Sequence, residues 1–114
     1  MMMTSIFSVD VTDIASELST RPVGAEARCK LLALLKEHER IEINFLNLSL
    51  TPSFADECVG RLAGVMGLEN FKRRVKLINV EDSTRPLIKH VVLQRCSQSK
   101  NESFSQHLPE PSHC

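Results

Sequence analysis

The chain has 114 residues, 42% of them hydrophobic and 25% charged, which suits a single globular domain. Its 14 Lys and Arg residues balance 14 Asp and Glu residues, and it contains no Trp or Tyr. Nucleic-acid binders usually carry a basic surplus and aromatic side chains for base stacking, so we expect no nucleic-acid partner. Because the apolar stretches are far shorter than a bilayer span and residues 1–5 do not resemble a signal peptide, we expect no membrane association and a cytoplasmic location.

The N-terminal part of the chain predicts a strand followed by a helix. Residues 6–14 alternate loosely between apolar and polar, as in an edge strand or a short hairpin. Over residues 24–38 the apolar side chains recur at helical spacing, which predicts the first long helix.

A second strand and helix follow directly. Residues 41–46 are rich in β-branched and apolar side chains and predict a central strand. The next helix begins either at Thr51, with Pro52 in its first turn, or at Ser53, with Asp56 completing a capping box. The sequence leaves both starts open, and Gly67 predicts the end of this helix.

Within that second helix, Gly60 and Gly64 predict close packing against another helix rather than phosphate contact. Residues 74–80 then predict a third strand. The basic run Lys72, Arg73, Arg74 and Lys76 is interpreted as the solvated start of that strand. Pro86 fits the first turn of a third helix that we expect to end near residue 95.

These elements predict an α/β fold with a small, mostly parallel sheet of three or four strands and helices mainly on one face. The domain is expected over residues 1–96, with residues 97–114 as a flexible polar tail, because that segment has few apolar side chains. So small a sheet leaves one face or edge open, and a homodimer is one way to cover it.

A resemblance to a known family emerges at the second helix. Ile43-Asn44-Phe45 leads into Leu50-Thr51-Pro52-Ser53-Phe54-Ala55-Asp56-Glu57, and Gly67-Leu68-Glu69-Asn70-Phe71 and Ile78-Asn79 follow. Over about residues 21–95 the chain resembles the STAS-like domain family of unknown function. The wider STAS group comprises bacterial anti-sigma factor antagonists and cytoplasmic domains of sulfate transporters, and its fold is a small sheet with helices on one side.

In the antagonists, a partner-switching kinase phosphorylates a Ser or Thr at the start of the helix after a central strand. The resemblance places that position at Ser53, with Thr51 beside it. It implies a regulatory protein–protein interaction module that uses Thr51, Ser53, Asp56 and Glu57 to bind a histidine-kinase-like ATPase or another signalling protein. The alternative interpretation of Thr51 and Ser53 is that they only cap the helix.

Chemistry-bearing residues form no recognisable catalytic set. The four Cys and four His residues show no C-x-x-C pair and no regular metal-ligand spacing, and no phosphate-binding glycine motif occurs. We therefore expect a protein that is not an enzyme and holds neither a metal nor a cofactor. Two alternatives remain: a self-assembling scaffold, and a nucleotide or small-ligand domain that binds near the start of the second helix.

Overall fold

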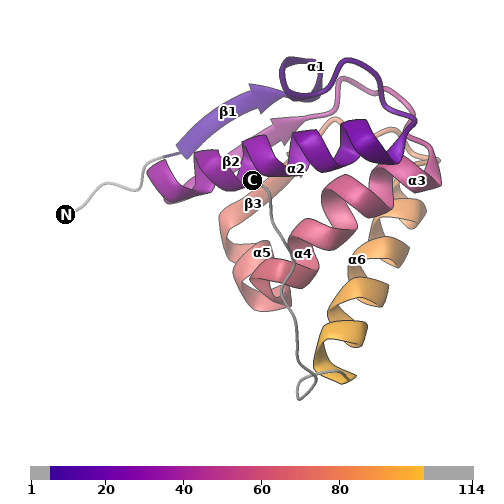
Figure 1. Cartoon of the computed structure of the whole chain (residues 1–114). Helices are drawn as coiled ribbons and strands as arrows, with labels where there is room; N and C mark the ends of the chain where they lie inside the picture. The colour runs from indigo at the N-terminus through magenta and orange to yellow at the C-terminus, as the bar shows by residue number, and fades with distance from the viewer. Residues whose placement is uncertain (1–5, 102–114) are drawn as a thin grey trace.

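The computed structural model describes residues 6–101, with side chains for residues 6–97. Three strands, β1 (Ile6–Asp10), β2 (Arg40–Asn44) and β3 (Val75–Ile78), form one parallel sheet in the order β1-β2-β3 (Figure 1). The middle strand is β2, so the prediction of a central strand is confirmed. The register places Ile41 between Phe7 on one side and Val75 on the other.

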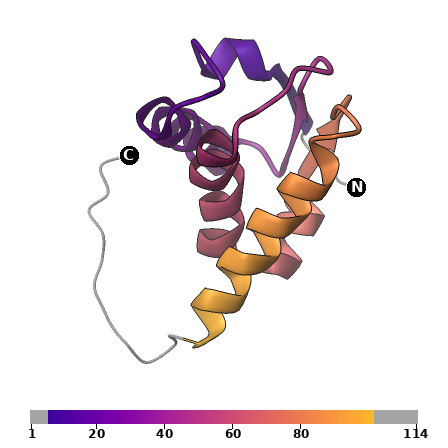
Figure 2. The same ribbon diagram turned by 90° about the vertical axis from the view of Figure 1, so that its right-hand side faces the viewer.

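Helices cover one face of this sheet, as predicted (Figures 1 and 2). Along β2, Ile41 and Ile43 are buried while Glu42 and Asn44 remain partly accessible, because successive side chains point to opposite faces. The register extends this alternation to the edge strands. The open face therefore carries Ile6, Ser8 and Asp10 from β1, Arg40, Glu42 and Asn44 from β2, and Lys76 and Ile78 from β3.

The segment after β1 differs from its prediction as an extended strand or hairpin. Residues 11–14 form a helical turn, α1 (Val11–Ile14). The Asp13 carboxylate accepts a hydrogen bond from the Asp10 backbone N–H at 3.3 Å, as in a capping box. Val11 and Ile14 both reach the core because a three-residue spacing brings them to one side of that turn.

The first long helix, α2 (Arg21–Glu37), starts three residues before its predicted boundary. Pro22 lies in its first turn, where backbone N–H groups have no partner within the helix, so proline costs no hydrogen bond there. At the other end, the Arg74 guanidinium donates to three carbonyl groups in the last turn of the helix and just beyond it. The acceptors are the carbonyl oxygens of Leu35, Glu39 and His38, at 2.6, 2.9 and 3.1 Å.

The second helix is continuous from Pro52 to Met66 and widens in the middle. It comprises α3 (Pro52–Ala55), the π-helical turn η1 (Asp56–Gly60) and α4 (Arg61–Met66). Gly67 ends it with a φ of 87°, which confirms the predicted end.

A short helix that we did not predict, α5 (Leu68–Arg74), follows at once. Of the basic run predicted to enter the third strand, only Lys76 lies in β3. Lys72, Arg73 and Arg74 lie instead in the last turn of α5, where cations interact favourably with the helix dipole.

The last helix, α6 (Arg85–Asn101), packs against the second one. A Cβ added at Gly60 would lie 3.1 Å from the Val91 Cβ, and one at Gly64 3.3 Å from the Arg95 Cβ, so the predicted close packing is confirmed. Since α6 runs past Cys96 to Asn101, helix occupies the first part of the predicted tail, and residues 102–114 lie outside the described residues. Within the described part of the chain, no helix has the length and apolarity needed to cross a membrane.

Candidate functional site

Thr51, and not Ser53, caps the second helix. The Phe54 backbone N–H donates to Thr51 Oγ1 at 3.2 Å, and the Thr51 hydroxyl donates to the Ser19 carbonyl at 2.8 Å. The first hydrogen bond caps the helix, and the second, together with that from the Thr51 N–H to the Leu18 carbonyl at 3.2 Å, holds the helix start against the segment that precedes α2. The two starts that the sequence left open are therefore resolved in favour of Thr51.

Ser53 lies two residues after Thr51, in the first turn of the helix, and is half-buried. Its hydroxyl makes no side-chain hydrogen bond with the part of the chain that the structure describes. Pro52 beside it is exposed. The Thr51 hydroxyl therefore caps the helix, and the Ser53 hydroxyl does not.

Asp56 and Glu57 are only 14% and 13% exposed and lie among four arginines. Asp56 accepts two hydrogen bonds from Arg95, at 2.8 and 2.6 Å, and one from Arg21 at 3.0 Å. Glu57 pairs with Arg21 at 3.0 Å and with Arg28 at 3.3 Å. We call these six residues the arginine cluster: Asp56, Glu57, Arg21, Arg28, Arg61 and Arg95.

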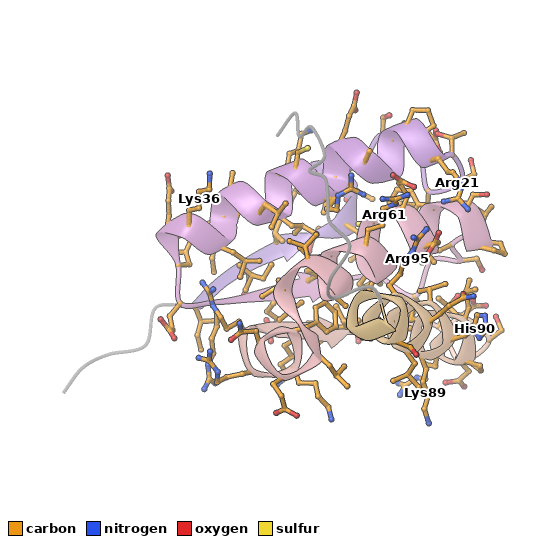
Figure 3. The ribbon with its side chains drawn as sticks, turned by 60° about the horizontal axis from the view of Figure 1, so that its bottom comes forward. Arg21, Lys36, Arg61, Lys89, His90 and Arg95 are labelled. Carbon is orange, nitrogen blue, oxygen red and sulfur yellow. The ribbon has the colours of Figure 1, made fainter. Side chains whose placement is uncertain are left out.

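The arginine cluster joins three helices. Figure 3 shows Arg21, Arg61 and Arg95 gathered where α2, the second helix and α6 approach one another. Because Asp56 and Glu57 are adjacent in η1, the first reaches α6 and the second reaches α2. These carboxylates, predicted to bind a partner, are thus engaged inside the domain.

The ionisation of both carboxylates follows from this environment. Hydrogen bonds from Arg95 and Arg21 outweigh partial burial and lower the pKa of Asp56 to about 2. Burial alone would raise the pKa of Glu57, but hydrogen bonds from Arg21 and Arg28 lower it overall. Two ionised carboxylates then face four guanidinium groups, an arrangement that suits structural ion pairing and not proton transfer.

The loop between β2 and α3, residues 45–51, forms the rim of the sheet beside the capped helix, and we call it the rim loop. Leu46 and Asn47 have left-handed backbone conformations, with φ of 56° and 60°. Asn44 Oδ1 accepts hydrogen bonds from the Leu46 N–H at 2.9 Å and from Asn79 Nδ2 at 3.0 Å. The Asn47 N–H donates to the Asn79 carbonyl at 2.8 Å, so the ends of β2 and β3 hold the rim loop in one shape.

This rim loop exposes two leucines that the sequence analysis did not single out. Leu46 is 37% and Leu48 38% exposed. A left-handed conformation costs a non-glycine L-residue about 1 kcal/mol. The exposed part of a leucine side chain also adds no hydrophobic free energy to folding. The sequence signal that could have found them is the pair of leucines flanking Asn47, between a buried strand and a capped helix.

Cys58 lies in the same helix but has no nucleophilic character. It is 1% exposed, and burial raises the pKa of its thiol to about 12. Among the described residues, no three His, Cys, Asp or Glu side chains gather as metal ligands.

The fold and the rim define a small parallel α/β domain with a capped helix start at the carboxyl ends of its strands. A family described as a STAS-like domain of unknown function matches residues 24–85, and the chain belongs to this family. The match covers most of α2 and continues through β2, the rim loop, the second helix, α5 and β3. Comparisons with curated proteins and with solved structures gave no match.

Proposed function

We propose that this chain is a non-catalytic regulatory module that binds another protein through the rim loop and the start of the second helix. Its partner in this proposal is a cytoplasmic histidine-kinase-like ATPase or another signalling protein. The proposal combines the STAS-like family with the geometry of the rim.

Leu46 carries this proposal. Its backbone conformation is unfavourable for leucine, and it remains 37% exposed, so part of its apolar surface contributes nothing to the stability of the domain. Hydrogen bonds to the carbonyl and amide groups of Asn44 and Asn79 fix the loop that presents it. A fixed apolar side chain can be buried by a partner with little loss of conformational entropy, which is how interface anchors contribute affinity.

Quantitative affinity capture from the source organism tests this surface. The bait is the tagged chain as wild type, as Leu46→Asp with Leu48→Asp, and as the control Val65→Asp, which alters a 69% exposed apolar residue on α4. We expect one signalling protein to be enriched by the wild type and the control, and depleted at least about tenfold by the rim-loop variant. Equal capture by all three baits would refute binding through the rim loop.

Phosphorylation at Ser53, and not at Thr51, is the switch that we propose for this module. A phosphate on Thr51 would occupy the oxygen that caps the helix, whereas the Ser53 hydroxyl has no such task. A phosphate on Ser53 would add about −1.5 to −2 charges to the first turn of the helix that follows the rim loop, and it would repel an apolar or acidic partner surface.

The captured partner allows this switch to be tested. We expect Ser53→Glu to weaken capture and Ser53→Ala to preserve it, while both retain the melting temperature of the wild type. Thr51→Ala should instead lower the free energy of unfolding by about 1 kcal/mol through loss of the cap. Equal capture by Ser53→Glu and Ser53→Ala would argue against the switch.

A further inference from the structure

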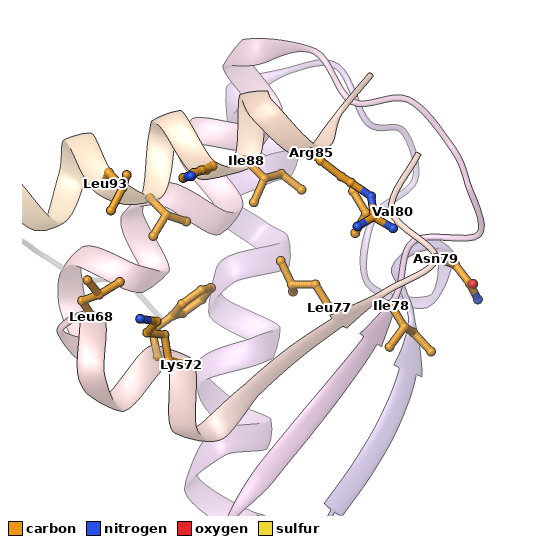
Figure 4. Close-up of a pocket in the computed structure, with 12 residues that line it drawn as sticks. Leu68, Lys72, Leu77, Ile78, Asn79, Val80, Arg85, Ile88 and Leu93 are labelled. Atoms are coloured by element: carbon orange, nitrogen blue, oxygen red, sulfur yellow. The ribbon is translucent and has the colours of Figure 1, made fainter. Parts of the chain in front are cut away.

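Beyond the rim, a groove lies along the free edge of the sheet. Its volume is about 560 Å³, and it lies between α5, the end of β3 and α6 (Figure 4). Its apolar wall comes from all three elements: Leu68 and Phe71 on α5, Leu77 and Val80 at the end of β3, and Ile88, Val92 and Leu93 on α6. Leu93 is 46% exposed, so this wall opens to solvent.

The groove contains the unpaired backbone edge of β3. In the described part of the chain β3 pairs only with β2, and residues 77–80 line the groove in succession. The Ile78 carbonyl accepts a hydrogen bond from the Phe45 N–H and so faces β2. Because backbone groups alternate along a strand, the N–H and C=O of Leu77 face the other way, into the groove.

The charge around the groove has one sign. Lys72, Arg85 and Lys89 line it, and no carboxylate does. Of these three cations, Arg85 forms an ion pair with Asp82 at 3.6 Å, and the Asp82 side chain is fully exposed. A second copy of this chain in the groove would bring the same cations against each other, which disfavours a homodimer through this edge.

We propose that this groove binds an extended, acidic segment of a partner protein that adds a strand to the free edge of β3. Main-chain hydrogen bonds to Leu77 give the segment its register, alternate apolar side chains enter the groove, and acidic side chains pair with Lys72 and Lys89. Asn79 lies between this groove and the rim loop, but Lys72, Leu77 and Lys89 belong to the groove and not to the rim loop, and the site does not depend on the proposed function.

Fluorescence anisotropy of a short labelled peptide with alternating Val and Glu, added to the full chain, tests this proposal. We expect it to bind at least about tenfold more tightly than the matched peptide with alternating Val and Lys, and more weakly as salt increases. Backbone N-methylation at alternate residues of the Val–Glu peptide should abolish binding, because it removes the strand hydrogen bonds. Equal binding of the acidic, basic and methylated peptides would overturn the proposal.

Variants of the chain locate the site. Lys72→Glu with Lys89→Glu should reduce binding of the Val–Glu peptide at least about tenfold, and the control Lys36→Glu, on α2 and distant from Lys89 in Figure 3, should not. Leu48→Asp in the rim loop should also leave peptide binding unchanged, which separates this result from that of the proposed function. Loss of binding with Lys36→Glu or Leu48→Asp would overturn the groove as the site.

Two other possible occupants of the groove, residues 102–114 and a second copy of the chain, predict different results. If residues 102–114 fill the groove, Phe104→Asp with Leu108→Asp in the full chain will raise the affinity for the peptide at least about tenfold. If a second copy fills it, light scattering will give a dimer that Leu93→Asp dissociates. Either outcome would overturn the proposal, and a monomer whose affinity is unchanged by the tail variant supports it.

Discussion

Asp56 is the residue whose environment differs most from what its neighbours in sequence suggest. An acidic pair in the first turn of a helix usually interacts with the helix dipole and with solvent. Here Asp56 receives three hydrogen bonds from two arginines that are 35 and 39 positions away in the chain. Its charge therefore contributes to the contact of the second helix with α2 and α6.

Replacement of Asp56 tests this contribution. We expect Asp56→Asn to lower the free energy of unfolding by about 2 kcal/mol, because it removes the carboxylate charge that accepts hydrogen bonds from Arg95 and Arg21. Asp82→Asn is the control, since Asp82 is fully exposed and pairs with Arg85 only at 3.6 Å, and its change should stay within about 0.5 kcal/mol. Urea denaturation at neutral pH measures both, and equal losses would contradict the structural role of Asp56.

The low pKa of Asp56 also predicts how stability depends on pH. A carboxyl group whose pKa is lower in the folded chain stabilises the fold above its ordinary value and loses this effect as the pH falls. For Asp56 the ordinary value is 3.8 and the folded value about 2, so the loss occurs between about pH 4 and pH 2. The difference in free energy of unfolding between wild type and Asp56→Asn should shrink over this range, and a constant difference would contradict the assignment.

At the scale of elements, the contact between the second helix and α6 depends on a missing side chain. A Cβ at Gly60 would lie 3.0 Å from Asp56 Oδ1 and 3.1 Å from both the Cβ and the carbonyl oxygen of Val91. Alanine normally favours a helix by about 1 kcal/mol over glycine, but these contacts leave no room for it.

We therefore expect Gly60→Ala to destabilise the domain by about 1–3 kcal/mol in urea denaturation. Gly64→Ala should have a smaller effect, because its added Cβ would lie 3.3 Å from the Arg95 side chain. Adding Val91→Ala to Gly60→Ala should recover part of the loss if the Val91 side chain is the obstacle. A stabilised Gly60→Ala would contradict the close packing.

The end of α2 depends on a side chain from α5. Arg74 donates to the carbonyl groups of Leu35, His38 and Glu39, whereas its neighbour Arg73 is 55% exposed and meets Glu39 only at 3.6 Å. We expect Arg74→Ala to reduce the free energy of unfolding by about 1–2 kcal/mol and Arg73→Ala to change it by less than about 0.5 kcal/mol. Thermal denaturation monitored by circular dichroism compares them, and a reversed order would refute the capping role.

For the whole molecule, the open face of the sheet bears on assembly. Its side chains are mostly polar or charged, and the Ser8 hydroxyl donates to Glu42 at 3.0 Å across two strands. Such a face can remain in water, so the small size of the sheet does not by itself require a second copy. Contacts within one chain do not test the predicted homodimer, which stays a prediction.

We expect that no assembly uses this open face. Glu42→Arg should then leave the molar mass from size-exclusion chromatography with light scattering unchanged across a wide range of protein concentration. A wild-type dimer that this substitution dissociates would show that the polar face is an interface after all.

How far prediction from sequence succeeded depended on the range of the interactions. The central strand around Ile41 and Ile43, the helix end at Gly67 and the close helix packing at Gly60 follow from local patterns of apolar residues and glycine, and the structure confirms them. Residues 11–14 and α5 were missed because elements of one or two turns contain too few residues to show a period.

By itself, the sequence determined the fold class, the family and the hydroxyl groups at the start of the second helix, since alternating strands and helices and a short motif depend on near neighbours. Only the tertiary structure decided that Thr51 is the cap, that Asp56 and Glu57 pair with arginines of three helices, and that Leu46 lies exposed on a fixed loop. The Thr51 hydroxyl is held by the Ser19 carbonyl 32 positions away, and Arg21, Arg28 and Arg95 reach the two carboxylates from 29 to 39 positions away. Leu46 has a backbone conformation that leucine does not favour, and no local pattern specifies either kind of feature.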